Sequence, residues 1–280
     1  MEAGGAHASR FDFGRAAACL TDAACRAGSA IMAHYLKASP VELKGDNSPV
    51  TAADRDSEAI ILEALARFVP DIPVVSEESC GAEIGPLPVR FFLVDPLDGT
   101  KEFIKRRSDF RVNIALIEDA RPCFGLVYAP ARALLALTTA RGEAVEAELH
   151  PNAAGAELDG LSLTPLRARP IRQDGLTALV SLSHLDAETE AFLGQLKVAE
   201  RSAAGSSVKF LAIAQGQADV YPRFGPTMEW DTAAGQAVLE AAGGSVVDLD
   251  GAPLGYGKSG SGLRNPSFIA WGRRDGTRAD

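Results

Sequence analysis

The stretch "LVDPLDGTKEF", Leu93–Phe103, joins an apolar run to two aspartates that flank a proline. The apolar residues predict a buried strand, and the Gly-Thr step with the charged residues after it predicts the start of a short helix. Pro96 fixes one backbone torsion and lacks an amide donor, so we expect the turn to direct Asp95 and Asp98 toward one point. Two carboxylates held that close are unfavourable unless a cation offsets their charge.

Other acidic residues stand at the ends of predicted strands or the starts of predicted helices. Glu77 follows the strand "PVVS", Asp231 follows Trp230 at a helix start, and Asp54 lies in the first turn of the predicted helix 51–68. Oxygen ligands without a His or Cys beside the aspartate pair favour a hard ion such as Mg²⁺ over Zn²⁺. A magnesium site beside a helix start, whose free amides attract anions, suits phosphoryl transfer.

The remaining pattern predicts layers of helices and sheets. Two helices, 13–38 and 51–68, precede a series of antiparallel strands, and the polar stretch 141–175 is the best boundary before strands and helices begin to alternate. We therefore expect an α+β and α/β chain in three parts. These are a flexible tail at 1–12, an N-terminal α+β domain with the metal site at 13–150, and a C-terminal α/β domain with the substrate-recognition residues at 151–280.

Composition excludes several classes of protein. The 280 residues carry 28 basic and 37 acidic side chains, so a net charge of -9 disfavours binding to DNA or RNA polymers. No run of about 18 apolar residues predicts a transmembrane segment, and the start of the chain lacks a signal-peptide pattern. The four cysteines are scattered without CxxC spacing, which favours buried thiols in a reducing compartment, so we expect a cytoplasmic location.

Three motifs in order, "EES", "DPLDGT" and "WDTAAG", resemble the signatures of the inositol monophosphatase-like, magnesium-dependent, lithium-sensitive phosphatases. The resemblance runs from about Ala16 to Trp271. "VDPLDGTKEFIKR", "GSSVKF" and "YPRFGPTMEWDTAAG" are similar to the 3'(2'),5'-bisphosphate nucleotidase branch of bacterial CysQ type. This implies a layered αβαβα sandwich of the inositol monophosphatase/fructose-1,6-bisphosphatase type. It also implies hydrolysis of adenosine 3',5'-bisphosphate, a by-product of sulfate assimilation, to AMP and phosphate. A peripheral association with the inner membrane, implied by this branch, has no visible basis in the sequence.

The resemblance implies a role for each matching residue. Two or three Mg²⁺ ions would be held by Glu77, Asp95, the Leu97 carbonyl, Asp98 and Asp231. Asp54 would hold the Thr100 hydroxyl, which orients and deprotonates a water activated by the metal. Lys209 and Arg223 would bind the 5'-phosphate, and His184 would pack on the adenine. The full substrate-binding set is Gly99, Thr100, His184, Ser206, Lys209 and Arg223.

Other readings stay open on the sequence alone. An inositol or sugar monophosphatase is the main alternative, because the metal turn contacts only the phosphate. A non-catalytic nucleotide- or metal-binding module is a second, and a P-loop NTPase is disfavoured by the lack of GxxxxGK[ST]. The oligomeric state, the number of metal ions and the activity toward sulfated nucleotides are also open.

Overall fold

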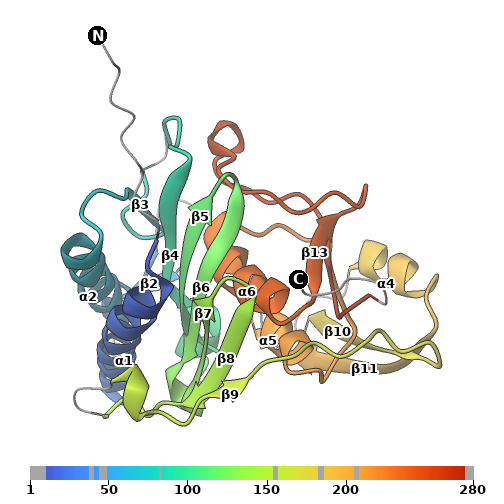
Figure 1. Cartoon of the computed structure of the whole chain (residues 1–280), viewed down its shortest axis with the longest axis horizontal. Coiled ribbons are helices and arrows are strands. Elements are labelled where there is room, and N and C mark those ends of the chain that lie inside the picture. Colours follow the sequence, from blue (N-terminus) through green and yellow to red (C-terminus); the bar gives the residue numbers. More distant parts are fainter. Residues whose placement is uncertain are drawn as a thin grey trace.

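The computed structural model describes residues 11–37, 41–43, 49–81, 84–153, 157–181, 186–204 and 208–274. Two sheets alternate with helices in five layers (Figure 1). Helices α1 and α2 cover the outer face of a seven-stranded sheet, α5 and α6 lie between this sheet and a five-stranded sheet, and α4 packs on the far side. The predicted αβαβα sandwich is confirmed. No helix of the described residues is long and apolar enough to span a bilayer.

The first helical layer consists of α1 (Phe13–Lys37) and α2 (Ala52–Phe68), with the antiparallel strands β1 (Val41–Leu43) and β2 (Pro49–Thr51) between them in the chain. Thr51 caps α2, because its hydroxyl accepts a hydrogen bond from the Ala53 amide at 3.1 Å. Residues 1–10 of the expected tail lie outside the described residues. Phe11 is 9% exposed and packs against Phe68, Phe92 and Phe124, so the described chain is already part of the core before residue 13.

The seven-stranded sheet has the same order in space as in sequence. Only the β3–β4 pair is parallel. Alternate residues of β4 face opposite layers: Phe92 and Val94 pack with α1 and α2, whereas Phe91 and Leu93 join the cluster around α5 and α6. The strands are β3 (Val74–Ser76), β4 (Arg90–Asp98), β5 (Arg111–Glu118), β6 (Arg121–Ala129), β7 (Leu134–Ala140), β8 (Glu143–Glu148) and β9 (Thr164–Pro165). The short helical elements between them are α3 (Thr100–Ile104), η1 (Pro130–Arg132) and η2 (Leu158–Gly160).

Two strands lie where the sequence indicated only a polar boundary. β8 and β9 fall inside residues 141–175, and they extend the first sheet to Pro165. β8 consists of Glu, Ala and a single Val, which are mostly poor strand formers. Pairing with β7 therefore determines its structure, and this tertiary effect is not readable from its own residues.

The second sheet begins at Leu176 and has the order β11-β10-β12-β14-β13. β10 is parallel to both of its neighbours, as the alternation of strands and helices predicted. β14 is antiparallel to both of its neighbours, β12 and β13. The strands are β10 (Leu176–Ser181), β11 (Val198–Ala204), β12 (Val220–Arg223), β13 (Ser245–Asp248) and β14 (Phe268–Trp271). The helical elements are α4 (Ala187–Leu193), α5 (Val208–Ala214), α6 (Glu229–Ala241) and η3 (Ser259–Ser261).

Helix α6 is the central element of the molecule (Figure 1). Its residues are buried almost without interruption from Glu229 to Leu239. A Cβ atom on Gly125 of β6 would lie 2.4 Å from the Ala234 carbonyl oxygen, so the helix backbone and the first sheet are in direct contact. On another side, a Cβ on Gly235 would meet the ring of Phe210 in α5 at 2.7 Å. The helix that carries Asp231 is therefore fixed against both neighbouring layers.

Candidate active site

The turn "DPLD" is the bulged end of β4 rather than a loop after it. Asp95 pairs with Asn113 of β5 and Asp98 pairs with Arg111, so three steps along β4 match two steps along β5. Residues three apart in a regular strand would face opposite sides of the sheet. The extra residue of the bulge restores the alternation and brings the two aspartates to the same side. The sequence predicted this convergence, although it attributed it to the proline alone.

Contacts to neighbouring elements fix the bulge. The Leu97 amide donates a hydrogen bond to Asp95 Oδ1 at 3.0 Å. The hydroxyl of Ser57, a buried residue of α2, donates to the Pro96 carbonyl at 2.7 Å. Helix α2 thus binds the backbone of the bulge directly. Ser57 escaped the sequence analysis, because a serine inside a helix carries no signal of a partner 39 residues away.

The other predicted metal ligands come from elements beside the bulge. Ser76 of β3 lies opposite Val94 of β4, and the Glu77 amide donates to the Val94 carbonyl at 3.1 Å, so Glu77 follows β3 next to Asp95. Asp231 lies in the first turn of α6, where its Oδ2 accepts the Met228 amide at 2.8 Å in a capping-box arrangement.

Electrostatics show that these carboxylates form one cluster. Burial raises the pKa of Asp95 well above its usual value, and the charges of Glu77, Asp98 and Asp231 raise it further. Burial likewise raises the pKa of Asp231 to about 8, with Asp98 as the largest charge effect. We call Glu77, Asp95, Asp98 and Asp231 the acid cluster. The negative charges of the neighbouring carboxylates thus make ionisation of Asp95 and of Asp231 less favourable.

The donor set fits a hard cation. As the side chains stand, no group of three or more His, Cys, Asp or Glu residues in the described ranges is arranged closely enough to hold a metal ion. The acid cluster nonetheless offers only oxygen ligands, and the Leu97 carbonyl lies at the bulge between two of them. A divalent cation bound between buried carboxylates would offset their mutual repulsion. Within the described ranges, these residues are therefore the candidates to hold Mg²⁺.

The predicted pair of Asp54 and Thr100 is in hydrogen-bond contact. The Thr100 hydroxyl lies 3.1 Å from Asp54 Oδ1 and 3.1 Å from the Leu97 carbonyl oxygen. The second oxygen of Asp54 accepts the amide of Thr51 at 2.8 Å and its hydroxyl at 2.7 Å. Burial raises the pKa of Asp54, and its hydrogen bonds to Thr51 and Thr100 partly oppose this effect. Asp54 is thus an oriented carboxylate with increased affinity for a proton.

Gly99 is required by the backbone at the end of the bulge. Its φ is 91°, and a Cβ atom there would approach the Asp109 carbonyl oxygen to 2.6 Å. Any other residue would be strained and would clash with the loop before β5. The helix that follows, α3, has five residues, in agreement with the short helix predicted from the sequence.

Cationic side chains lie on the side of the second sheet. Lys209 in α5 is 2% exposed, and its Nζ lies 4.7 Å from the centre of the Tyr221 ring. Burial lowers the pKa of Lys209 to about 7, and the charges of Arg223 and Arg111 lower it further. Arg223 ends β12 and donates to the carbonyls of Gly225 and Pro226 at 3.1 and 2.9 Å. The predicted residues His184 and Ser206 lie outside the described residues.

Arg111 is a further cation that the sequence analysis missed. It is 1% exposed, and its Nε donates to Asp98 Oδ2 at 2.8 Å. An arginine at the start of a strand is normally read as a solvated end residue. Only the register of β4 and β5 places it opposite Asp98, and this register was not available from the sequence.

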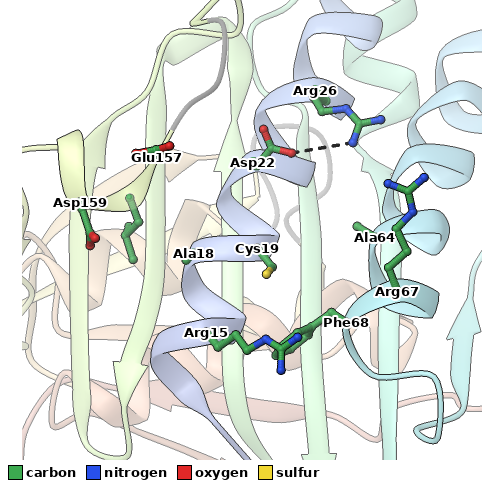
Figure 2. Close-up of a pocket in the computed structure, with 11 residues that line it drawn as sticks. Arg15, Ala18, Cys19, Asp22, Arg26, Ala64, Arg67, Phe68, Glu157 and Asp159 are labelled. Carbon is green, nitrogen blue, oxygen red and sulfur yellow. Dashed lines mark ion pairs between the residues drawn. The ribbon is translucent and has the colours of Figure 1, made fainter.

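A separate groove of about 630 Å³ lies between α1, α2 and η2 (Figure 2). Arg26 pairs with Asp22 across 3.8 Å at its edge. The groove contains none of the acid cluster and no arrangement of groups suited to catalysis, so the bulge remains the candidate active site. The labelled lining residues are Arg15, Ala18, Cys19, Asp22, Arg26, Ala64, Arg67, Phe68, Glu157 and Asp159.

Comparisons with known proteins agree with this geometry. The chain is 45% identical over 245 residues to the 3'(2'),5'-bisphosphate nucleotidase CysQ of Escherichia coli O157:H7, covering 86% of this chain and 94% of that protein. It matches the crystal structure of CysQ from Bacteroides thetaiotaomicron with a TM-score of 0.73 and 36% identity, over 95% and 99% of the two chains. The extragenic suppressor protein SuhB of Bartonella henselae matches with a TM-score of 0.66 and 25% identity, over 90% and 92%. Residues 15–273 match the inositol monophosphatase family, and the chain belongs to this family.

Proposed function

We propose that this chain is a magnesium-dependent phosphatase that hydrolyses the 3'-phosphate of adenosine 3',5'-bisphosphate to AMP and phosphate. The observation that carries the proposal is the acid cluster with the Thr100–Asp54 pair on one side and the buried cation Lys209 on the other. The 45% identity to a protein named as a 3'(2'),5'-bisphosphate nucleotidase supports this substrate over an inositol or sugar phosphate.

In the proposed site, the acid cluster and the Leu97 carbonyl would hold two or three Mg²⁺ ions. When bound, the metal supplies charge that offsets the phosphate oxygens and lowers the pKa of a water molecule. The acid cluster itself positions that charge, since Asp95 and Asp98 share one side of the sheet and Glu77 and Asp231 approach from β3 and α6.

Thr100 and Asp54 would remove the proton from the attacking water. Thr100 Oγ1 can donate to Asp54 while its lone pair accepts a hydrogen bond from water. Because burial raises the pKa of Asp54, this carboxylate is a better proton acceptor than an exposed aspartate. Water oxygen then bonds to phosphorus and the bond from phosphorus to the ribose oxygen breaks. The ribose oxygen takes a proton from solvent, and Asp54 returns to solvent the proton that it accepted.

Recognition of the rest of the substrate would come from the second half of the chain. Lys209 is a buried cation whose Nζ has no hydrogen bond or ion pair to the described residues, which is the state expected of a phosphate-binding lysine without its ligand. Arg223 supplies a second positive charge near it. His184 and Ser206 remain proposed contacts to the adenine and the phosphate, and Gly99 and Thr100 remain proposed contacts to the transferred phosphate.

A substrate panel tests the proposal. Phosphate release from adenosine 3',5'-bisphosphate and from inositol 1-phosphate is measured with Mg²⁺ and again after chelation. We expect the bisphosphate to be the better substrate by kcat/KM, activity to depend on Mg²⁺, and lithium to inhibit. Faster hydrolysis of inositol 1-phosphate would assign the chain to the monophosphatases of the same family.

We also propose that residues 13–150 form the unit that binds metal and residues 151–280 the unit that recognises the nucleotide. The change of sheet between Pro165 and Leu176 supports a division into two units, with β8 and the bulge on one side and Lys209 on the other, although it falls later in the chain than residue 150. A cytoplasmic location is proposed from the four free thiols, which are typical of proteins in reducing compartments.

A further inference from the structure

Arg111 connects the acid cluster to the cations of the second half. It is the first residue of β5, and the bulge in β4 places it directly opposite Asp98. Its Nε lies 2.8 Å from Asp98 Oδ2, and the whole residue is 1% exposed. A guanidinium in this position is buried inside the protein next to a proposed metal ligand.

The pairing with Asp98 does not satisfy the guanidinium. Arg111 Nη1 is buried and has no hydrogen-bond partner among the described residues. Burying a charged group is unfavourable unless it is well paired, and a buried hydrogen bond that is not made adds to this cost. The free-energy cost therefore lies mainly at the nitrogen that faces no acceptor.

A second buried cation near Arg111 is also without an anionic partner. Lys209 is 2% exposed, its Nζ lies against the Tyr221 ring at 4.7 Å, and no hydrogen bond or ion pair joins it to any described residue. The charge of Arg111 helps to lower the pKa of Lys209, so the two positive groups repel each other at close range. Two buried cations that repel each other, each with donor capacity left over, form a site for an anion.

From this geometry we propose that Arg111 binds the phosphate of the substrate that is not transferred. Its Nε holds Asp98 in the acid cluster, and Nη1 donates to an oxygen of the second phosphate beside Lys209. The inference rests on the proposed function and adds a specificity-determining residue to it. One guanidinium would thus contact both the metal-binding carboxylate and the group that distinguishes a bisphosphate from a monophosphate.

The test uses AMP, the proposed product, as a probe that carries only the 5'-phosphate and is not turned over. Its affinity is measured by calorimetry at saturating Mg²⁺ for the wild-type chain and for R111Q and R111K. We expect R111Q to bind AMP about tenfold more weakly or worse, because a charge-assisted hydrogen bond is lost. Adenosine affinity should stay unchanged, and R111K should recover part of the loss. The KM for the bisphosphate should rise in R111Q more than the KM for 3'-AMP.

Arg90 provides the matched control. It pairs with Glu118 at the opposite end of the same two strands, at 2.9 Å from Nε to Oε1. R90Q removes a similar cross-strand arginine–carboxylate pair, and we expect it to leave AMP affinity unchanged. Thermal unfolding of each variant shows that it is folded, and R111K gives the measurement if R111Q does not fold.

Three results would overturn the inference. Unchanged AMP affinity in R111Q, with normal bisphosphate turnover by the wild type, would remove Arg111 from the phosphate site and leave the proposed function intact. Equal losses of AMP and adenosine affinity would indicate a general structural role. A wild-type chain that neither binds AMP nor hydrolyses the bisphosphate would overturn the proposed function together with this assignment.

Discussion

The acid cluster and the cations around Lys209 are neighbouring regions of opposite charge. In each of them, buried groups of like charge repel one another. In the acid cluster, burial and mutual repulsion raise the pKa values of Asp95 and Asp231. Among the cations, burial and repulsion lower the pKa of Lys209. Each region is unfavourable alone, and each is suited to an ion of the other sign. The comparison separates the two tasks of the site: one region acts on a phosphate, and the other selects which molecule carries it.

The largest expected effect comes from the acid cluster. Asp95→Asn keeps the shape of the side chain and removes one negative charge. We expect kcat for the bisphosphate to fall by roughly a thousandfold or more, because metal binding loses a central ligand. In metal-free protein the melting temperature should rise, since one of several repelling buried charges is gone. Both are measured, by initial rates and by thermal unfolding with a chelator.

A matched control separates loss of metal binding from loss of fold. Asp219 is 0% exposed and accepts two hydrogen bonds from Arg169, at 2.9 and 2.7 Å, far from the bulge in sequence. Asp219→Asn breaks a satisfied ion pair, so it should lower the melting temperature while leaving kcat of the folded protein near the wild-type value. Wild-type turnover by D95N at saturating Mg²⁺ would refute the role of the acid cluster.

The second effect concerns proton removal at the edge of the acid cluster. Thr100→Val removes the hydroxyl that contacts Asp54, and we expect kcat to fall by about a hundredfold to ten-thousandfold, as for loss of a general base. KM should change little, because the metal and the cations remain. Thr100→Ser restores a hydroxyl and should restore most of the rate. If the valine variant kept normal kcat, the proton would have to leave by another route.

The third effect lies on the cation side. Lys209→Met removes the buried charge, and kcat/KM for adenosine 3',5'-bisphosphate should fall by about tenfold to a hundredfold. The value for 3'-AMP, which lacks the 5'-phosphate, should fall much less. Lys105→Met, at an exposed lysine after the metal turn, controls for general loss of positive charge. Equal losses for both substrates in K209M would show that Lys209 does not distinguish them.

The smallest expected effect is a dependence of AMP affinity on pH, caused by the titration of Lys209. Because the pKa of Lys209 is about 7, the side chain is charged below pH 7 and loses its proton as pH rises above it. AMP affinity should therefore fall by about fivefold from pH 7 to pH 8, as binding becomes linked to uptake of one proton. Lys209→Arg stays charged and should show no such fall. Calorimetry of AMP binding from pH 6 to pH 9 measures both profiles.

The sequence predicted the acid side of this comparison better than the cation side. Asp54 and Thr100 were identified through the resemblance to the phosphatase family, because an acid in the first turn of a helix and a Gly-Thr step after a strand are ordinary features by themselves. The sequence also placed Asp95 and Asp98 together, although the cause is a bulge that depends on pairing with β5. The sequence shows which residues are present and in what order, whereas the contacts that bring them together come from the tertiary structure.

The features that escaped prediction depend on register or on packing between layers. Arg111 lies opposite Asp98 only because β4 and β5 are offset by one residue at the bulge. Ser57 matters through a hydrogen bond from a helix to a strand in another layer. β8 exists because β7 pairs with it, against the weak strand propensity of its own residues. In each case the deciding contact is long-range, and no local pattern encodes it.

The close contact between Gly125 and α6 has a consequence for how the site selects substrates by the distance between their two phosphates. Helix α6 carries Asp231, touches β6 without a side chain between them, and packs on the ring of Phe210 one residue after Lys209. The acid cluster and the buried lysine are thus held at a separation that neither side can change independently. A molecule with two phosphates would therefore bind only if the number of bonds between its phosphates matches this separation. The affinities of homologous bisphosphates with increasing linker length would measure the separation.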